Sequence, residues 1–166
     1  MLIRTGAVCP RGANVWRMNV SDTISTLDSL IETLKDGQEG FRTAAEDVKD
    51  PELKTLFNRF SLQRSQFVGE LQQEVTRLGE GEPEKTSSIA GAIHRGWINL
   101  KSALAGGDEN AILSECERGE DSAVSEFQSA LEKELPADVR EIVERQYVAV
   151  KAAHDQVRDL RDSRGK

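Results

Sequence analysis

Four long amphipathic stretches constrain the fold of this chain more than any other feature of its sequence. They run from about residue 21 to 49, 51 to 79, 108 to 134 and 136 to 162, and each repeats apolar residues at intervals of three or four. That spacing places the apolar side chains on one face of an α-helix. Such helices must cover their apolar faces against one another, so the sequence predicts an all-α protein.

Short turn signals join these helices in pairs. Asp50 and Pro51 separate the first two, with Asp50 as the N-cap and Pro51 at the first helical position. Leu135 and Pro136 separate the last two, and Ser21 is expected to cap the first helix. Because almost no residues lie between paired helices, each pair must fold back as an antiparallel hairpin. Two matched hairpins predict a four-helix bundle.

The connector between the hairpins, residues 82–107, is long enough to run along the bundle. Its first part is polar, whereas its second part, SIAGAIHRGWINLKSAL, has apolar residues at helical spacing. We therefore expect a crossover helix, followed by Asp108 as the cap of the next helix. A long crossover between helices 2 and 3 is the connectivity of a ferritin-like bundle. The predicted fold is thus all-α, a ferritin-like four-helix bundle of two antiparallel hairpins with a helical crossover.

The first 17 residues differ from the rest of the chain. They contain three arginines and no acidic residue, and they lack helical periodicity. They also lack the continuous apolar segment of a signal peptide. We expect residues 1–17 to form a flexible N-terminal extension, with docking of Trp16 on the body or on a partner as the alternative. Residues 18–166 are expected to form a single bundle domain.

Charge and composition exclude several classes of partner. The formal net charge is −7, and removing the three positive charges of residues 1–17 leaves −10 for residues 18–166. A body this acidic is poorly suited to binding phosphates, so we expect no nucleic-acid partner. The apolar runs are too short to span a bilayer, so we expect no membrane partner. Cys9 and Cys116 form no disulfide framework, which favours a cytoplasmic location.

One polar residue interrupts the apolar face of each long helix. These residues are Gln38, Arg64, Glu120 and Gln146, and each lies at a similar distance from its hairpin turn. In helices of matched length they fall at one level, which predicts a polar layer in the middle of the bundle. A buried carboxylate is unfavourable unless it is paired or binds a metal. We therefore expect Glu120 to pair with Arg64 in place of a metal, flanked by the two glutamines.

Metal binding is the alternative hypothesis, because ferritin-like di-iron proteins hold their metals in the bundle core. Their ligand set includes a Glu-x-x-His motif on two helices. This chain has no such motif, since Gly91 and Lys151 stand three residues before its two histidines. The remaining candidates are carboxylates and one imidazole, a set that suits iron, manganese or zinc. These candidate ligands are Glu39, Glu70, Glu117, Glu120 and His154.

The crossover contains a further candidate site. His94 and Trp97 either line a pocket between the crossover and the bundle, or Trp97 anchors the crossover by packing against the bundle. The chain contains no pattern typical of Ser/His/Asp or Cys/His catalysis and no glycine-rich phosphate loop. These features favour a protein without enzymatic activity.

Five segments carry a resemblance to a known family. They are LIETLKDGQEGFRTAAEDVKDPELK, QRSQFVGELQQEV, IAGAIHRGWINLKSAL, ECERGEDSAV and VKAAHDQVRDLR. Together they resemble an uncharacterised bacterial family of short ferritin-like four-helix-bundle proteins that carries a domain-of-unknown-function label. The resemblance covers about residues 20–162 and implies the ferritin-like bundle. It implies no established activity and no catalytic residue.

The expected function follows from the predicted fold and the missing ligand motif. We expect a non-enzymatic ferritin-like protein with a stress-related or protein-interaction role and no cofactor. A homodimer is expected, because bundles often associate through an exposed helix face, and the identity of any other protein partner stays open. The alternative is an iron- or manganese-binding oxidoreductase, or an iron-handling protein, that uses Glu117, Glu120 and His154.

Overall fold

A computed structural model describes residues 11–79, 97 and 99–165 of the protein, with side chains from residue 20 onward. Regular secondary structure in these residues is entirely helical, which confirms the all-α class. None of these helices is both long enough and apolar enough to cross a membrane. The helices are α1 (Arg11–Asp47), α2 (Pro51–Leu78), α3 (Leu100–Gly106), α4 (Glu109–Leu131) and α5 (Ala137–Arg164).

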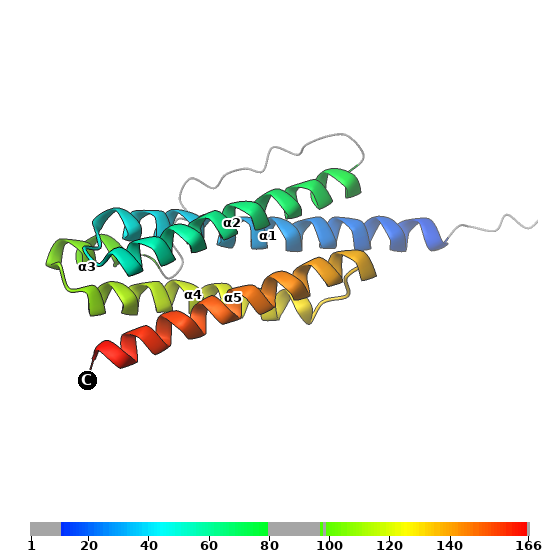
Figure 1. The fold of residues 1–166 in the computed structure, drawn as a ribbon. Coiled ribbons are helices and arrows are strands. Elements are labelled where there is room, and N and C mark those ends of the chain that lie inside the picture. Colours follow the sequence, from blue (N-terminus) through cyan, green and yellow to red (C-terminus); the bar gives the residue numbers. More distant parts are fainter. Residues whose placement is uncertain (1–10, 80–96, 98, 166) are drawn as a thin grey trace, which may run out of the picture.

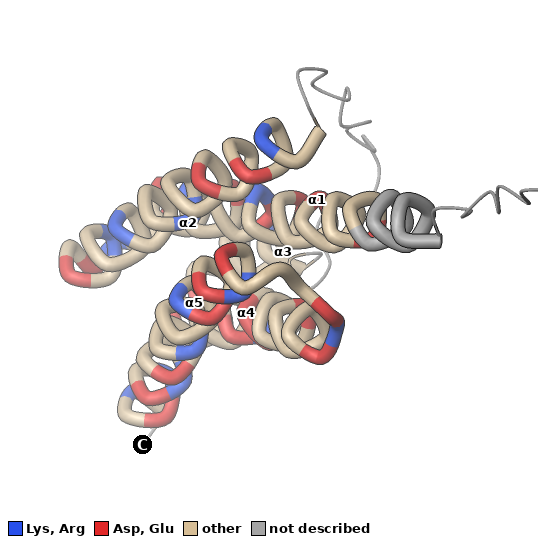
Figure 2. Tube along the Cα trace, turned by 90° about the vertical axis from the view of Figure 1, so that its right-hand side faces the viewer, with Lys and Arg blue, Asp and Glu red and all other residues tan. Residues whose placement is uncertain are grey.

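The four long helices form two antiparallel hairpins. Figure 1 shows α1 alongside α2 and α4 alongside α5, with the short α3 at the end of the bundle that holds the C-terminus. The hairpins meet mainly through α1 and α4. Acidic and basic residues are interspersed along α2 and α5 (Figure 2), so neither sign of charge dominates these two helices.

The caps at the start of α2 and α4 agree with the prediction. The side chain of Asp50 accepts a hydrogen bond from the backbone N–H of Glu52 at 2.8 Å, and Pro51 is the first helical residue. Asp108 accepts from the backbone N–H of Asn110 at 2.9 Å. Each carboxylate therefore satisfies a backbone donor that has no partner within its own helix.

The first helix begins earlier than expected. α1 starts at Arg11 and continues through Ser21, so the predicted cap at Ser21 is wrong. Once a helix has formed, each added residue gains a backbone hydrogen bond, and growth past a weak cap is therefore favourable. Residues 11–17 of the predicted extension are helical, and residues 1–10, with Cys9, lie outside the described part of the chain.

The crossover is described only in its last part. The sequence predicts a helix over residues 88–104, but Trp97 and Asn99 lie in a turn and α3 begins only at Leu100. Residues 80–96 and 98 lie outside the described residues. Gly107 ends α3 with a φ of 69°. Glycine adopts this left-handed conformation without the steric penalty of a Cβ atom, which explains the sharp stop before α4.

A charged cluster joins the two hairpins at the end near α3. Arg164 at the end of α5 pairs with Asp50 and lies 3.2 Å from Glu109, at the start of α4. Glu109 Oε1 also accepts hydrogen bonds from the backbone N–H groups of Asp50 and Lys49 at 3.0 and 3.2 Å. The α1–α2 turn is therefore tied to both helices of the second hairpin.

The core consists of two apolar clusters arranged along the bundle. One includes Leu100 of α3 and so lies at the α3 end. The other fills the opposite half. Along α2, Phe60 belongs to the first cluster and Phe67 to the second, and Arg64 lies between them. The break between the clusters is therefore the level at which the sequence places its polar residues.

Candidate functional site

Arg64 of α2 and Glu120 of α4 form a buried ion pair between the two apolar clusters. Arg64 Nη2 lies 2.5 Å from Glu120 Oε2, and the side chains are 1% and 0% exposed. Because one partner belongs to each hairpin, the pair links the hairpins at the middle of the bundle. The structure thus brings together the two charged residues of the predicted layer.

The guanidinium of Arg64 has further neighbours. Its Nη1 donates to Gln63 Oε1 at 2.6 Å, and its central carbon lies 5.8 Å from the centre of the Phe41 ring. That distance is within the range of a cation–π interaction. Gly37 of α1 lies against the stem of the same side chain. The position of the cation is therefore set from α1, α2 and α4 together.

The two predicted glutamines occupy different environments. Gln146 of α5 is fully buried, and its Nε2 donates to the backbone carbonyl of Phe67 at 3.3 Å. The side chain of Gln38 is only half-buried, and its backbone carbonyl accepts from Ser61 Oγ at 2.9 Å. Gly37, one residue earlier, takes the interior position on α1. A Cβ atom added there would lie 3.6 Å from the Arg64 side chain, an ordinary contact distance, so this position packs directly against Arg64.

The polar layer is incompletely paired. Arg64 Nε, Glu120 Oε1 and Gln146 Oε1 are buried with no hydrogen-bond partner among the described residues. Removing a polar atom from water without a partner lowers the free energy of unfolding. The layer therefore contributes less to stability than its hydrogen bonds alone suggest.

Burial changes the acidity of two groups in this region. Burial raises the pKa of the Glu120 carboxyl, and the positive charge of Arg64 opposes that rise. The Cys116 thiol, one turn earlier on α4, is also fully buried. Its pKa is raised well above the ordinary value, first by burial and then by the charges of Glu120 and Glu115. A thiol that stays protonated is a poor nucleophile and metal ligand, so Cys116 serves as a small core residue.

The candidate metal ligands do not converge on the polar layer. Glu39 lies on the surface, half exposed, and pairs with Arg42. Glu70 pairs with Arg145 across α2 and α5. A cation bound to Glu120 would have to displace a guanidinium that is permanently charged. The donor set in the core therefore suits an ion pair better than a metal.

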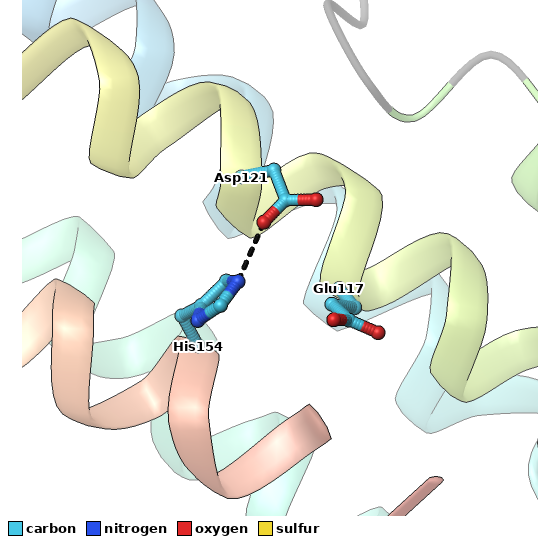
Figure 3. Close-up of side chains that lie close together, drawn as sticks. All are labelled: Glu117, Asp121 and His154. Atoms are coloured by element: carbon cyan, nitrogen blue, oxygen red, sulfur yellow. Dashed lines mark hydrogen bonds and ion pairs between the residues drawn. The ribbon is translucent and has the colours of Figure 1, made fainter. Parts of the chain in front are cut away.

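A second group of ligating side chains lies between α4 and α5 (Figure 3). Glu117 and Asp121 are one helical turn apart on α4, and His154 faces them from α5. One ligand atom from each of the three lies within 4.8 Å of the other two. Glu117 and His154 are among the predicted candidates, but Asp121 takes the place expected for Glu120, which points into the core. The spacing of Glu117 and Asp121 at i and i+4 was the signal in the sequence.

Both ring nitrogens of His154 face carboxylates. Nε2 lies 2.5 Å from Asp121 Oδ1, and Nδ1 lies 3.0 Å from Asp155 Oδ1. The His154 side chain is 12% exposed, whereas Asp121 is 63% exposed. Glu117 pairs with Arg161 of α5. The imidazole is therefore held in a fixed orientation next to carboxylates that solvent can reach.

Trp97 fills a slot between the two hairpins. A Cβ atom added at Gly40 of α1 or at Gly119 of α4 would lie under 3.0 Å from the indole ring. Phe41 meets the indole edge-on, with ring centres 5.1 Å apart. In the described part of the crossover, Trp97 therefore acts as a packing anchor, while His94 lies outside the described residues.

A hollow that the sequence pattern does not predict lies between α2 and α5. Its volume is about 530 Å³, and its lining includes Leu53, Leu56 and Leu160 together with Arg59 and Arg164. These residues come from helices far apart in the sequence. Their proximity depends on how the two hairpins are placed, which periodicity within one helix does not reveal.

Comparison with known proteins places part of the chain in a family. A family described as "Domain of unknown function (DUF2383)" matches residues 22–133. The matched segment includes most of α1 and all of α2, α3 and α4, and therefore both partners of the Arg64–Glu120 pair. Among curated proteins, no sequence matches this chain.

Proposed function

This chain belongs to the DUF2383 family, a domain of unknown function, and we propose that it is a non-enzymatic, ferritin-like four-helix-bundle protein with a stress-related or protein-interaction role. The observation that carries the proposal is the buried pair of Arg64 and Glu120, 2.5 Å apart. The ferritin-like part of the proposal is supported by two antiparallel hairpins with a long connection between α2 and α4.

We infer the absence of di-iron catalysis from the residues that the four long helices place in the middle of the bundle. A ferritin-like di-iron centre needs carboxylates from four helices and two histidines. Here α4 supplies the carboxylate of Glu120, whereas α2 supplies the cation of Arg64. At the same level α1 supplies Gly37 and α5 supplies the amide of Gln146. One carboxylate that is already neutralised by a guanidinium is a poor site for two metal ions.

The rival function, an iron- or manganese-dependent oxidoreductase or iron-handling protein using Glu117, Glu120 and His154, has weaker support. Glu120 faces Arg64 in the core, whereas Glu117 and His154 meet on the surface between α4 and α5. For one metal ion to bind all three residues, the Glu120 carboxylate would have to leave Arg64 and turn from the core toward the face of α4 that carries Glu117.

Metal analysis of the core variant tests the proposal. The full chain and its Glu120→Gln variant would be loaded with Fe²⁺ or Mn²⁺, dialysed and analysed for metal per chain. We expect equal metal content in both proteins, because the core holds none. A loss of bound metal in a folded Glu120→Gln protein would overturn the proposal. If that variant fails to fold, Arg64→Met/Glu120→Leu gives the same test without an unpaired buried charge.

We also propose that the protein associates with a second copy of itself. Leu62 of α2 and Val148 of α5 are large apolar side chains that are 61% and 67% exposed. Burying them against a second copy would remove apolar surface from water. Light scattering is expected to give a dimer mass that falls toward the monomer in Leu62→Glu/Val148→Glu. A monomer mass for the unmodified chain at all concentrations would contradict this part of the proposal.

A further inference from the structure

Glu117, Asp121 and His154 lie outside the polar layer, and we propose that they form a binding site for a divalent transition-metal ion of the Zn²⁺ class. The site offers one imidazole nitrogen and two carboxylate oxygens. Zinc accepts His nitrogen and Asp or Glu oxygen as ligands, and open zinc sites have three protein ligands with water in the remaining position. Imidazole favours such ions over Mg²⁺ and Ca²⁺, which prefer oxygen ligands alone.

Helix geometry brings the three ligands together. Glu117 and Asp121 lie on the same face of α4 because residues four apart are neighbours on a helix surface. His154 approaches from the antiparallel partner, α5, so the site bridges the second hairpin (Figure 3). A tetrahedral ion requires its ligand atoms about 3 to 3.5 Å apart, given bonds of about 2.0 Å. His154 Nε2 and Asp121 Oδ1 are already 2.5 Å apart, and all three ligand atoms lie within 4.8 Å of one another, so the main movement required is a turn of the Glu117 carboxylate from Arg161 toward the other two ligands.

A neighbouring carboxylate holds the imidazole in the orientation that a metal needs. Asp155 Oδ1 lies 3.0 Å from Nδ1 of His154, which turns Nε2 toward Asp121. Asp155 is itself held by Lys151, whose Nζ lies 2.6 Å away. Metal-binding histidines commonly donate their second N–H to a carboxylate in this way. Asp155 is therefore assigned as a positioning residue and not as a ligand.

Arg161 competes with the metal for Glu117. Its guanidinium pairs with Glu117 and also lies 2.8 Å from Asp162. When a metal ion binds Glu117, Arg161 keeps Asp162 as its partner, so the displaced cation is not left unpaired. Removing the arginine charge should therefore strengthen metal binding. This expectation separates a metal site from a purely structural network, in which Arg161 is only a favourable partner.

Calorimetric titration of the full chain with ZnCl₂ tests the site. We expect one Zn²⁺ per chain, and affinity reduced more than about tenfold in His154→Gln and in Asp121→Asn. Asp155→Asn should weaken binding by about 10- to 100-fold through loss of orientation. Arg161→Met should bind more tightly than the unmodified chain. Histidine ring signals in NMR spectra should move on Zn²⁺ addition and identify His154 as the residue affected.

Control variants show whether Zn²⁺ binds at the proposed site or elsewhere on the chain. The chain has two histidines and two cysteines, of which Cys116 is fully buried, so His94→Gln and Cys9→Ser test the remaining side chains of these two types. Asp159→Asn removes a carboxylate that is 71% exposed on the same helix as His154. All three should keep Zn²⁺ binding. Binding that survives in His154→Gln, or the absence of binding at micromolar Zn²⁺, would overturn the site. Glu120→Gln reports on the core alone, so the two proposals can fail separately.

Discussion

Arg64 and Glu120 are 56 residues apart in the chain, yet Nη2 of the arginine lies 2.5 Å from Oε2 of the glutamate in the middle of the bundle. The pair joins α2 to α4 and lies between two apolar clusters. A buried pair of this kind seldom increases stability compared with apolar residues of the same volume, but each charge depends strongly on the other. This dependence gives the first prediction.

Removing one charge of the pair should destabilise the protein far more than removing both. Arg64→Met or Glu120→Leu alone should lower the free energy of unfolding by about 3–5 kcal/mol, because the remaining charge is buried without a partner. The double variant should lose much less, since no isolated charge remains. Urea denaturation of the four proteins measures the coupling. If the two single losses simply add, the proposed energetic coupling is wrong.

Gly119→Ala should destabilise the protein although alanine is the better helix former. The new Cβ atom would lie under 3.0 Å from the indole of Trp97, so the anchor of the crossover must move. Thermal unfolding should show a lower midpoint. In a Trp16→Phe background, where Trp97 is the remaining tryptophan, the fluorescence should shift to longer wavelength as the indole becomes solvated.

Gly69→Ala is the matched control for that substitution. Gly69 lies within α2, and a Cβ atom added there would have no heavy atom within 4 Å outside its own turns of the helix. The same replacement should therefore stabilise the protein by about 0.5–1 kcal/mol, through helix propensity alone. Equal effects of the two substitutions would mean that the Trp97 slot is not tightly packed.

The stability of the hairpin junction should depend on pH through Asp50. A hydrogen bond from Arg164, followed by one from the backbone of Glu52, lowers the pKa of the Asp50 carboxyl in the folded protein. Its stabilising effect is therefore complete above the unfolded value of about 3.9 and is lost as the pH falls through the lower folded value. Asp50→Asn keeps a good N-cap but removes the charge. Denaturation midpoints of the two proteins should differ at pH 7 and converge in acid; a constant difference would contradict the role of the charge.

Cys116 should react slowly with thiol reagents. Its side chain is fully buried and its pKa is raised well above the ordinary value, so little thiolate is available. In a Cys9→Ser variant, where Cys116 is the remaining cysteine, labelling of the folded protein at pH 8 should be more than about tenfold slower than in denaturant. Comparable rates in the two conditions would show that the thiol is accessible.

Local sequence signals determined most of the helix boundaries. Asp50 and Pro51 mark the first hairpin turn because the carboxylate caps the helix and the proline has no N–H to leave unsatisfied. The apolar periodicity also indicated which residues turn inward. Arg64 and Glu120 stood out because each replaced an apolar residue in that pattern, and both are buried. The start of α1 could not be predicted, because a usable cap at Ser21 does not stop a helix that gains a hydrogen bond with every further residue.

The sequence by itself determined the helices, their buried faces and the level of the polar residues, because these depend on contacts between residues close in the chain. Only the tertiary structure decided that Gly37, and not Gln38, faces Arg64, and that Asp121, and not Glu120, joins Glu117 and His154. Adjacent residues on a helix differ by about 100° in direction. Periodicity identifies the inward side but does not say which of two neighbours meets a given partner, which depends on how the hairpins pack.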